Sequence, residues 1–123
     1  MTRTRATAKQ AGAKFERLIA DHLAMVIDDR IDRRVKTGAN DRGDLTGWRH
    51  NGMRIVAELK DYGGRILAGP WLNEAEVERR NDDAHIGLVI VKRRGTTKPG
   101  DQIVLMTLDN LTRLLGHDTE EPC

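Results

Sequence analysis

Apolar residues recur at helical spacing in the first part of the chain. From Ala11 to Val26 they follow one another at steps of three and four, which places them on one face of an amphipathic helix. This stripe consists of Ala11, Phe15, Leu18, Ile19, His22, Leu23 and Val26. Glu16 lies one step off the stripe, at its edge. Residues 1–9 are polar and basic, and we expect them to form a flexible tail.

The middle of the chain changes to the alternation of β-strands. Residues 30–35 alternate loosely, and residues 44–49 form a short candidate strand. Asn51-Gly52 is a strong signal for a two-residue hairpin turn, so residues 53–60 are predicted to be the partner strand. Successive side chains of a strand point to opposite faces of the sheet. One face therefore carries Ile55, Ala57 and Leu59, and the other carries Val56, Glu58 and Lys60.

The second half of the chain predicts two more helices and two more strands. Pro70 suits the first turn of a helix over about residues 71–81. Residues 87–91 are continuously apolar, as expected of a strand that is covered on both faces. A strand over residues 102–107 and a helix over residues 108–115 follow. This order predicts an α/β fold with a mixed central β-sheet flanked by helices.

Length and composition restrict the class of protein. A chain of 123 residues fits one domain with one hydrophobic core, and we expect residues 117–123 to form a second flexible tail. The only cysteine is Cys123, which excludes an internal disulfide and a clustered cysteine site for zinc. No apolar run approaches the roughly 20 residues of a membrane helix. The basic start lacks the apolar stretch of a secretory signal, so a cytoplasmic location is expected.

Positive charge is concentrated in three clusters, although the net charge is only +2. A set of basic clusters on a weakly charged protein indicates a polyanion as partner, whereas any single cluster also fits a solvated surface. Aromatic residues make up 3% of the chain, which argues against binding through rows of stacked bases. The clusters are Arg3, Arg5, Lys9, Lys14 and Arg17; then Arg30, Arg33, Arg34, Lys36 and Arg42; then Lys92, Arg93, Arg94 and Lys98.

Asp44, Glu58 and Lys60 form the most informative constellation. Residues equally far from the Asn51-Gly52 turn lie opposite each other, so Asp44 falls near Leu59, given a bulge or small register shift at the strand end. Two adjacent carboxylates repel each other, and a cation relieves this repulsion. Mg²⁺ prefers oxygen ligands, polarises a phosphate and acidifies a bound water. The Lys60 ammonium would orient that water or stabilise charge in the transition state.

Two further readings of these residues remain open. Glu16 would supply a third carboxylate if the first helix packs across the sheet. Glu58 and Lys60 also fit a plain ion pair on a half-exposed strand, because any such strand can alternate charges.

The same residues resemble the PD-(D/E)XK nuclease superfamily, and within it the archaeal-type Holliday junction resolvases and their bacteriophage relatives. The resemblance spans about residues 12–94. It rests on Phe15-Glu16, Arg34, Thr37-Gly38, Gly43-Asp44 and Val56-Ala57-Glu58-Leu59-Lys60.

The resemblance implies a restriction-endonuclease-like fold, in which Glu16, Asp44 and Glu58 bind Mg²⁺ and Lys60 assists catalysis. Mn²⁺ is expected to substitute for Mg²⁺. The implied activity is hydrolysis of two strands of a four-way DNA junction by a homodimer, in the host cytoplasm if a phage encodes it. No membrane and no small-molecule cofactor are expected. The residues expected to contact DNA are Arg34, Lys36, Thr37, Gly38, Arg42, Lys92, Arg93 and Arg94.

The chain departs from the family pattern in two places. Gly43 replaces the proline before the aspartate, and the helix after the site lacks a glutamine, offering Asn73, Glu74 and Glu76 instead. These departures put the substrate in question. The alternatives are a less selective nuclease acting on linear, flapped or branched DNA, and a non-catalytic DNA-binding module of the same fold.

Overall fold

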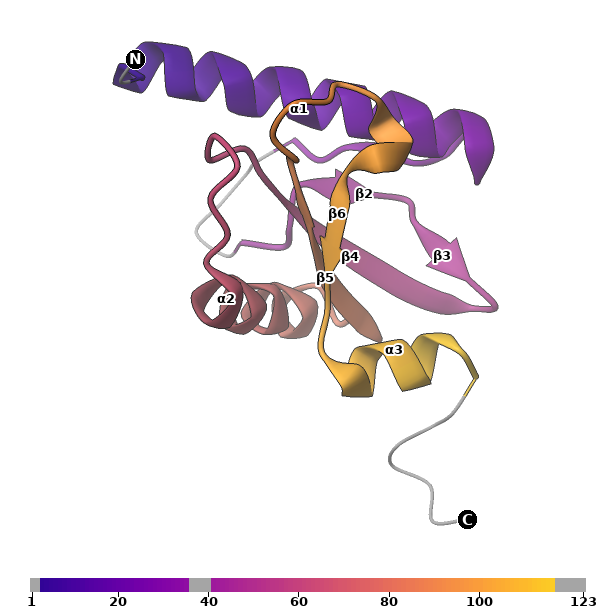
Figure 1. Ribbon diagram of the computed structural model, residues 1–123. Coiled ribbons are helices and arrows are strands. Elements are labelled where there is room, and N and C mark those ends of the chain that lie inside the picture. Colours follow the sequence, from indigo (N-terminus) through magenta and orange to yellow (C-terminus); the bar gives the residue numbers. More distant parts are fainter. Residues whose placement is uncertain (1–2, 36–40, 117–123) are drawn as a thin grey trace.

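The computed structural model describes residues 3–35 and 41–116, which form a mixed α/β structure. A four-stranded sheet in the order β3-β4-β5-β6 lies between α1 on one side and α2 on the other (Figure 1). β4 pairs in parallel with β5, while β3 and β6 are antiparallel to their neighbours. The elements are α1 (Arg5–Val26), β1 (Asp32–Arg33), β2 (Leu45–Thr46), β3 (Arg49–His50), β4 (Met53–Lys60), α2 (Ala68–Asn81), β5 (Ile86–Val91), the 3-10 helix η1 (Pro99–Asp101), β6 (Ile103–Leu105) and α3 (Leu108–Leu114).

The first helix begins earlier than the apolar stripe predicts. The side chain of Thr4 accepts a hydrogen bond from the backbone N–H of Thr7, and this N-cap starts α1 at Arg5. Residues 5–9 are therefore helical, which corrects the expectation of a tail. The stripe is buried at Phe15, Ile19 and Leu23, but it ends there, because Val26 is 54% exposed.

The predicted hairpin is confirmed, and its first strand is shorter than expected. His50 lies opposite Met53 across the Asn51-Gly52 turn. The expected strand over residues 44–49 is split into β2 and β3 by Gly47, whose φ is +81°. A Cβ atom at Gly47 would lie 2.2 Å from the carbonyl oxygen of Arg30, so this crossing admits only glycine. β2 turns away to pair with β1 in a separate two-stranded sheet.

The two faces of β4 pack against different helices, as the alternation predicts. Ile55, Ala57 and Leu59 belong to the main core, which α1 closes with Phe15 and Ile19. The opposite face of the sheet meets α2 in a smaller core of Trp71, Ala75, Val89 and Val91. Trp71 is a packing residue, buried to 3% exposure and in edge-to-face contact with Tyr62.

Gly87 brings α2 close to the sheet. A Cβ atom at this position of β5 would lie 2.8 Å from the backbone oxygen of Ala75, in the middle of α2. The N–H of Gly87 donates to Oδ1 of Asn110, which fastens α3 to the same strand. The spacing between α2 and the sheet therefore depends on the absence of one side chain. Within residues 3–35 and 41–116, no helix is long and apolar enough to cross a bilayer.

Candidate metal centre

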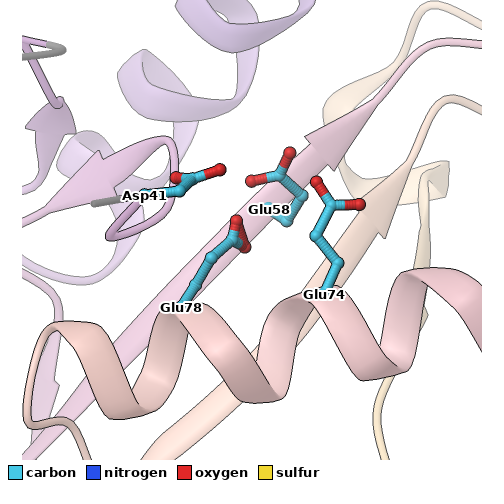
Figure 2. Close-up of side chains that lie close together, drawn as sticks. All are labelled: Asp41, Glu58, Glu74 and Glu78. Atoms are coloured by element: carbon cyan, nitrogen blue, oxygen red, sulfur yellow. The ribbon is translucent and has the colours of Figure 1, made fainter. Parts of the chain in front are cut away.

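Four carboxylates converge between β4 and α2, and we call them the acidic cluster: Asp41, Glu58, Glu74 and Glu78. Each offers an oxygen that lies within 4.8 Å of the corresponding oxygens of the other three. Figure 2 shows Glu58 projecting from β4 towards Glu74 and Glu78 of α2, with Asp41 approaching from the segment before β2. Carboxylate oxygens are the ligands that hard divalent cations prefer, so the acidic cluster can hold such an ion.

Helical and strand periodicity together place these side chains. Glu74 and Glu78 are one turn apart on α2, on the face that also carries Trp71 and Ala75. That face packs on the sheet, so the two carboxylates are carried inwards with the apolar residues. Glu58 alternates with Ala57 and Leu59 on β4 and therefore points away from α1, towards α2.

Two of the four carboxylates are buried with side-chain oxygens that lack a hydrogen-bond partner among the described residues. Glu78 is 1% exposed and Glu58 is 7% exposed. Among the described residues, neither side-chain oxygen of Glu78 has a hydrogen-bond partner, and neither does Oε2 of Glu58. The two groups face each other, but two ionised carboxylates are both acceptors and form no hydrogen bond unless they share a proton. A buried charge is tolerated only with a partner, so these oxygens require either a proton or a cation.

Burial accordingly raises the pKa of both glutamates. For Glu58, burial is the largest effect, and the negative charges of Asp44 and Glu74 act in the same direction. Together they outweigh the opposing effects of the hydrogen bond with Glu78 and of the Lys60 ammonium. For Glu78, burial, contact with Glu58 and the charges of Asp41 and Glu74 all raise the pKa. A cation between these groups would compete with the protons they hold.

Lys60 supplies positive charge at the edge of the acidic cluster. Its Nζ lies 3.2 Å from Oε1 of Glu58 and 3.0 Å from Oε2 of Glu74. Burial opposes its charge, but Glu58 and Glu74 outweigh this and raise the pKa of Lys60 above its ordinary value. The ammonium also lies 5.8 Å from the ring centre of Tyr62 and 5.9 Å from that of Trp71. Lys60 is therefore a firmly positioned cation.

Asp44 lies where the hairpin predicts. It is 3% exposed, and the backbone N–H of Leu59 donates to its Oδ2 at 2.8 Å. The N–H of Asp44 donates in turn to the carbonyl oxygen of Ala57 at 2.9 Å. Asp44 is close enough to Glu58 to raise its pKa, although its carboxylate does not belong to the four that form the acidic cluster.

The backbone conformation before Asp44 explains why glycine stands at position 43. Gly43 is buried and has a φ of +90°. Proline is fixed near −65° and cannot adopt this conformation. The chain therefore reaches Asp44 by a backbone path that a proline at position 43 would not allow.

Glu16 lies away from the acidic cluster. Its carboxylate pairs with Nη2 of Arg33 at 3.3 Å. Both residues line an open groove of about 670 Å³ between α1 and the segment around β1, together with Lys9, Gly12, Ala13, Arg17, Asp32, Arg34 and Val35. The acidic cluster therefore contains two carboxylates of α2 and does not include that of Glu16.

The residues expected to bind DNA fall into three groups. Arg34 and Lys92 are engaged within the protein: Arg34 contacts Asp82 at 3.0 Å, and Nζ of Lys92 donates to the backbone oxygens of Arg93 and Thr96. Arg42, Arg93 and Arg94 are exposed. Lys36, Thr37 and Gly38 lie outside the described residues.

The sequence also contained a signal for the α2 carboxylates, which the prediction based on Asp44, Glu58 and Lys60 did not use. Trp71, Glu74, Ala75 and Glu78 are spaced as one face of a helix. A face with a tryptophan and an alanine is a packing face, so glutamates on it must be carried towards the sheet. Asp41 has no comparable signal, because it lies in an irregular segment.

Comparisons of the chain with protein-family models, with curated proteins and with solved structures found no match.

Proposed function

We propose that this protein is a Mg²⁺-dependent DNA endonuclease with Asp44, Glu58 and Lys60 at its catalytic centre, on a restriction-endonuclease-like fold. The observation that carries the proposal is the pair of buried carboxylates Glu58 and Glu78, which have oxygens without a hydrogen-bond partner among the described residues. Glu58 also contacts the Lys60 ammonium. A site with only structural duties gains nothing from burying repelling charges. A hydrolytic site uses them to hold a cation.

The donor set fits a hard divalent ion. Glu58 and Asp44 would hold Mg²⁺, and Mn²⁺ prefers the same oxygen ligands. When bound, such an ion polarises the phosphodiester and lowers the pKa of a coordinated water. Asp44 is fixed in position by the N–H of Leu59, so its carboxylate cannot swing away from the site.

Lys60 is suited to stabilise the negative charge that develops on phosphorus oxygens during hydrolysis. Its ammonium is held by two carboxylates and flanked by two aromatic rings, so it is already oriented before substrate arrives. In the reaction, water attacks phosphorus and gives up a proton to solvent, one P–O ester bond breaks, and the leaving oxygen takes up a proton from solvent. The products are a phosphate end and a hydroxyl end.

DNA as substrate is supported by the charge at the same end of the sheet. The N–H of Lys92 donates to the carbonyl oxygen of Lys60, so the basic segment after β5 begins beside the catalytic strand. Arg93 and Arg94 are exposed there and can contact phosphates. We further propose a four-way junction as the preferred substrate and a homodimer as the active form, on the strength of the sequence resemblance. Binding should weaken steeply with salt.

The proposal is tested by cleavage of a synthetic four-way junction beside its linear duplex arms, with Mg²⁺ and with EDTA. We expect paired symmetric nicks in the junction that require Mg²⁺. Asp44→Asn and Glu58→Gln should abolish them, and Lys60→Met should reduce the rate by roughly 10²–10³-fold. Glu76→Gln is the matched control, because Glu76 is on α2 but pairs with Arg79 outside the acidic cluster.

Other outcomes separate the alternatives. Equal cleavage of linear DNA would retain the nuclease and reject the junction preference. If neither DNA is cut in Mg²⁺ or Mn²⁺ while junction binding persists, the nuclease proposal is wrong and the protein is a DNA-binding module.

A further inference from the structure

The loop that joins β4 to α2, residues 61–67, exposes apolar surface directly beside the proposed catalytic centre. Tyr62 is 47% exposed, Ile66 43% and Leu67 37%. Single apolar residues are common on protein surfaces, whereas three in one short loop concentrate apolar surface at one place. The centre of the Tyr62 ring lies 5.8 Å from the Lys60 ammonium. The loop therefore borders the position at which a phosphate would meet Lys60.

The exposed ring of Tyr62 is held in position. It packs edge-to-face on the buried Trp71, with the ring centres 5.1 Å apart and an interplanar angle of 65°. Arg3, just before α1, donates to the carbonyl oxygen of Asp61 at 2.9 Å and to its Oδ1 at 3.0 Å. In Figure 1 the loop rises from the end of β4 towards the N-terminal end of α1 before it turns into α2. A ring that is oriented before its ligand arrives loses little conformational freedom on binding.

Positive charge surrounds this ring. Arg65 belongs to the loop and is exposed. Gly64 lies against the exposed Arg94 of the basic segment after β5, because a Cβ atom at Gly64 would be 2.9 Å from Cβ of Arg94. Asp61, the acidic residue of the loop, is already paired with Arg3. An exposed aromatic ring among guanidinium groups matches a nucleotide, whose base stacks on the ring and whose phosphates pair with the cations.

We propose that Tyr62 stacks on an unpaired base next to the scissile phosphate, while Arg65 and Arg94 contact the flanking phosphates. This inference rests on the proposed function, because it takes DNA as the substrate and places its phosphate at Lys60. A paired base inside a duplex is covered on both faces by its neighbours and offers the ring no surface. An unpaired base leaves the stack at a lower cost, so the loop selects DNA that is interrupted or branched at the cut position.

The test is DNA binding in EDTA, measured by fluorescence anisotropy with two duplexes. One duplex contains a single unpaired 2-aminopurine, and the other contains the same base paired with thymine. The wild type should prefer the first and quench the fluorescence of its unpaired base. Tyr62→Ala should weaken binding of the first duplex by about 5- to 150-fold, remove the quenching and leave the second duplex unaffected. Tyr62→Phe keeps the ring and should behave as the wild type.

Two further variants separate stacking from other contributions. Arg65→Gln should weaken binding of both duplexes by the same factor, because a phosphate contact does not report base pairing. Tyr62→Leu keeps apolar bulk against Trp71 without an aromatic ring, and it replaces Tyr62→Ala if circular dichroism shows that the alanine variant is unfolded. Leu108→Ala is the matched control, because Leu108 is 73% exposed on α3, and it should bind both duplexes as the wild type does.

The outcomes distinguish this inference from the proposed nuclease. If Tyr62→Ala weakens both duplexes equally, or neither, Tyr62 does not stack on an unpaired base. If the variant instead changes the oligomeric state in light scattering, the loop is a contact between copies and the inference is wrong. Ring-dependent binding without cleavage in Mg²⁺ would leave the inference intact and refute the nuclease. Cleavage with the same preference in the wild type and in Tyr62→Ala would do the reverse.

Discussion

The two faces of the central sheet are built on opposite principles. The face towards α1 is filled by apolar side chains, among them Phe15, Ile19 and Ile55. The face towards α2 has only a small apolar core. Glu58 and Glu78 are buried beside it, with oxygens that have no hydrogen-bond partner among the residues the structure describes. A fully buried isoleucine contributes about 1.5–3 kcal/mol, whereas a buried polar group without a partner costs about 1–3 kcal/mol. The α1 face therefore stabilises the fold, and the α2 face gives up stability to hold charge.

The largest expected effect belongs to the α1 face. Ile86 is fully buried in the main core, so Ile86→Ala should lower the free energy of unfolding by about 2–5 kcal/mol. Urea unfolding with and without Mg²⁺ measures this, and the loss should be the same in both. Val104→Ala, at a position 53% exposed on β6, is the control and should change little. If the loss of unfolding free energy in Ile86→Ala depends on Mg²⁺, the two faces do not have separate roles in stability and ion binding.

A substitution on the α2 face should raise the free energy of unfolding instead of lowering it. Glu78→Leu removes a buried acid next to Trp71 and Ala75, so without divalent ions the free energy of unfolding should rise by about 1–4 kcal/mol. The variant should also lose most of the stabilisation that Mg²⁺ gives the wild type. Glu76→Leu removes a more exposed ion pair with Arg79 and should cost less than about 1 kcal/mol. Destabilisation of metal-free Glu78→Leu would mean that Glu78 is satisfied in the fold and needs no cation.

A smaller, graded effect should appear with pH. Burial raises the pKa of Glu58 from 4.5 to about 7 and also raises that of Glu78. The folded state then binds protons more tightly than the unfolded chain. The contribution of Glu58 protonation to the free energy of unfolding is therefore fully present below pH 4.5 and is lost as the pH rises through 7. In the proposed metal centre Mg²⁺ would replace these protons, so the increase in Tm that it causes should grow between pH 5 and pH 8. The same increase at both pH values would show that the ion binds elsewhere.

The sequence predicted what depends on local periodicity. The Asn51-Gly52 turn fixed the register, and the register placed Asp44 next to Leu59. Alternation along residues 53–60 correctly separated the Glu58 face from the Ile55 face. These features follow from strand geometry within one hairpin, where few residues separate the partners.

The sequence did not predict what depends on how distant elements approach each other. Glu16 and Glu78 are both glutamates at the border of an apolar helical face, and periodicity cannot tell which helix covers the face that carries Glu58. The split at Gly47 has the same origin, because its cause is the carbonyl of Arg30, in a segment that crosses there only in the folded chain. The resemblance predicts that Arg34 contacts DNA, and nothing in the sequence indicated its ion pair with Asp82, just after α2, at 3.0 Å.

Gly87 has a consequence for ion selectivity. Its missing side chain lets α2 approach β5 closely, and α2 carries two of the four carboxylates of the acidic cluster. Mg²⁺ binds oxygen at about 2.0–2.1 Å and Ca²⁺ at about 2.3–2.6 Å, so a difference of a few tenths of an ångström in helix position decides which ion fits. In the proposed metal centre, an uncharged residue without any ligand atom would then favour the smaller of the two ions, and a wider spacing at this glycine would favour the larger one.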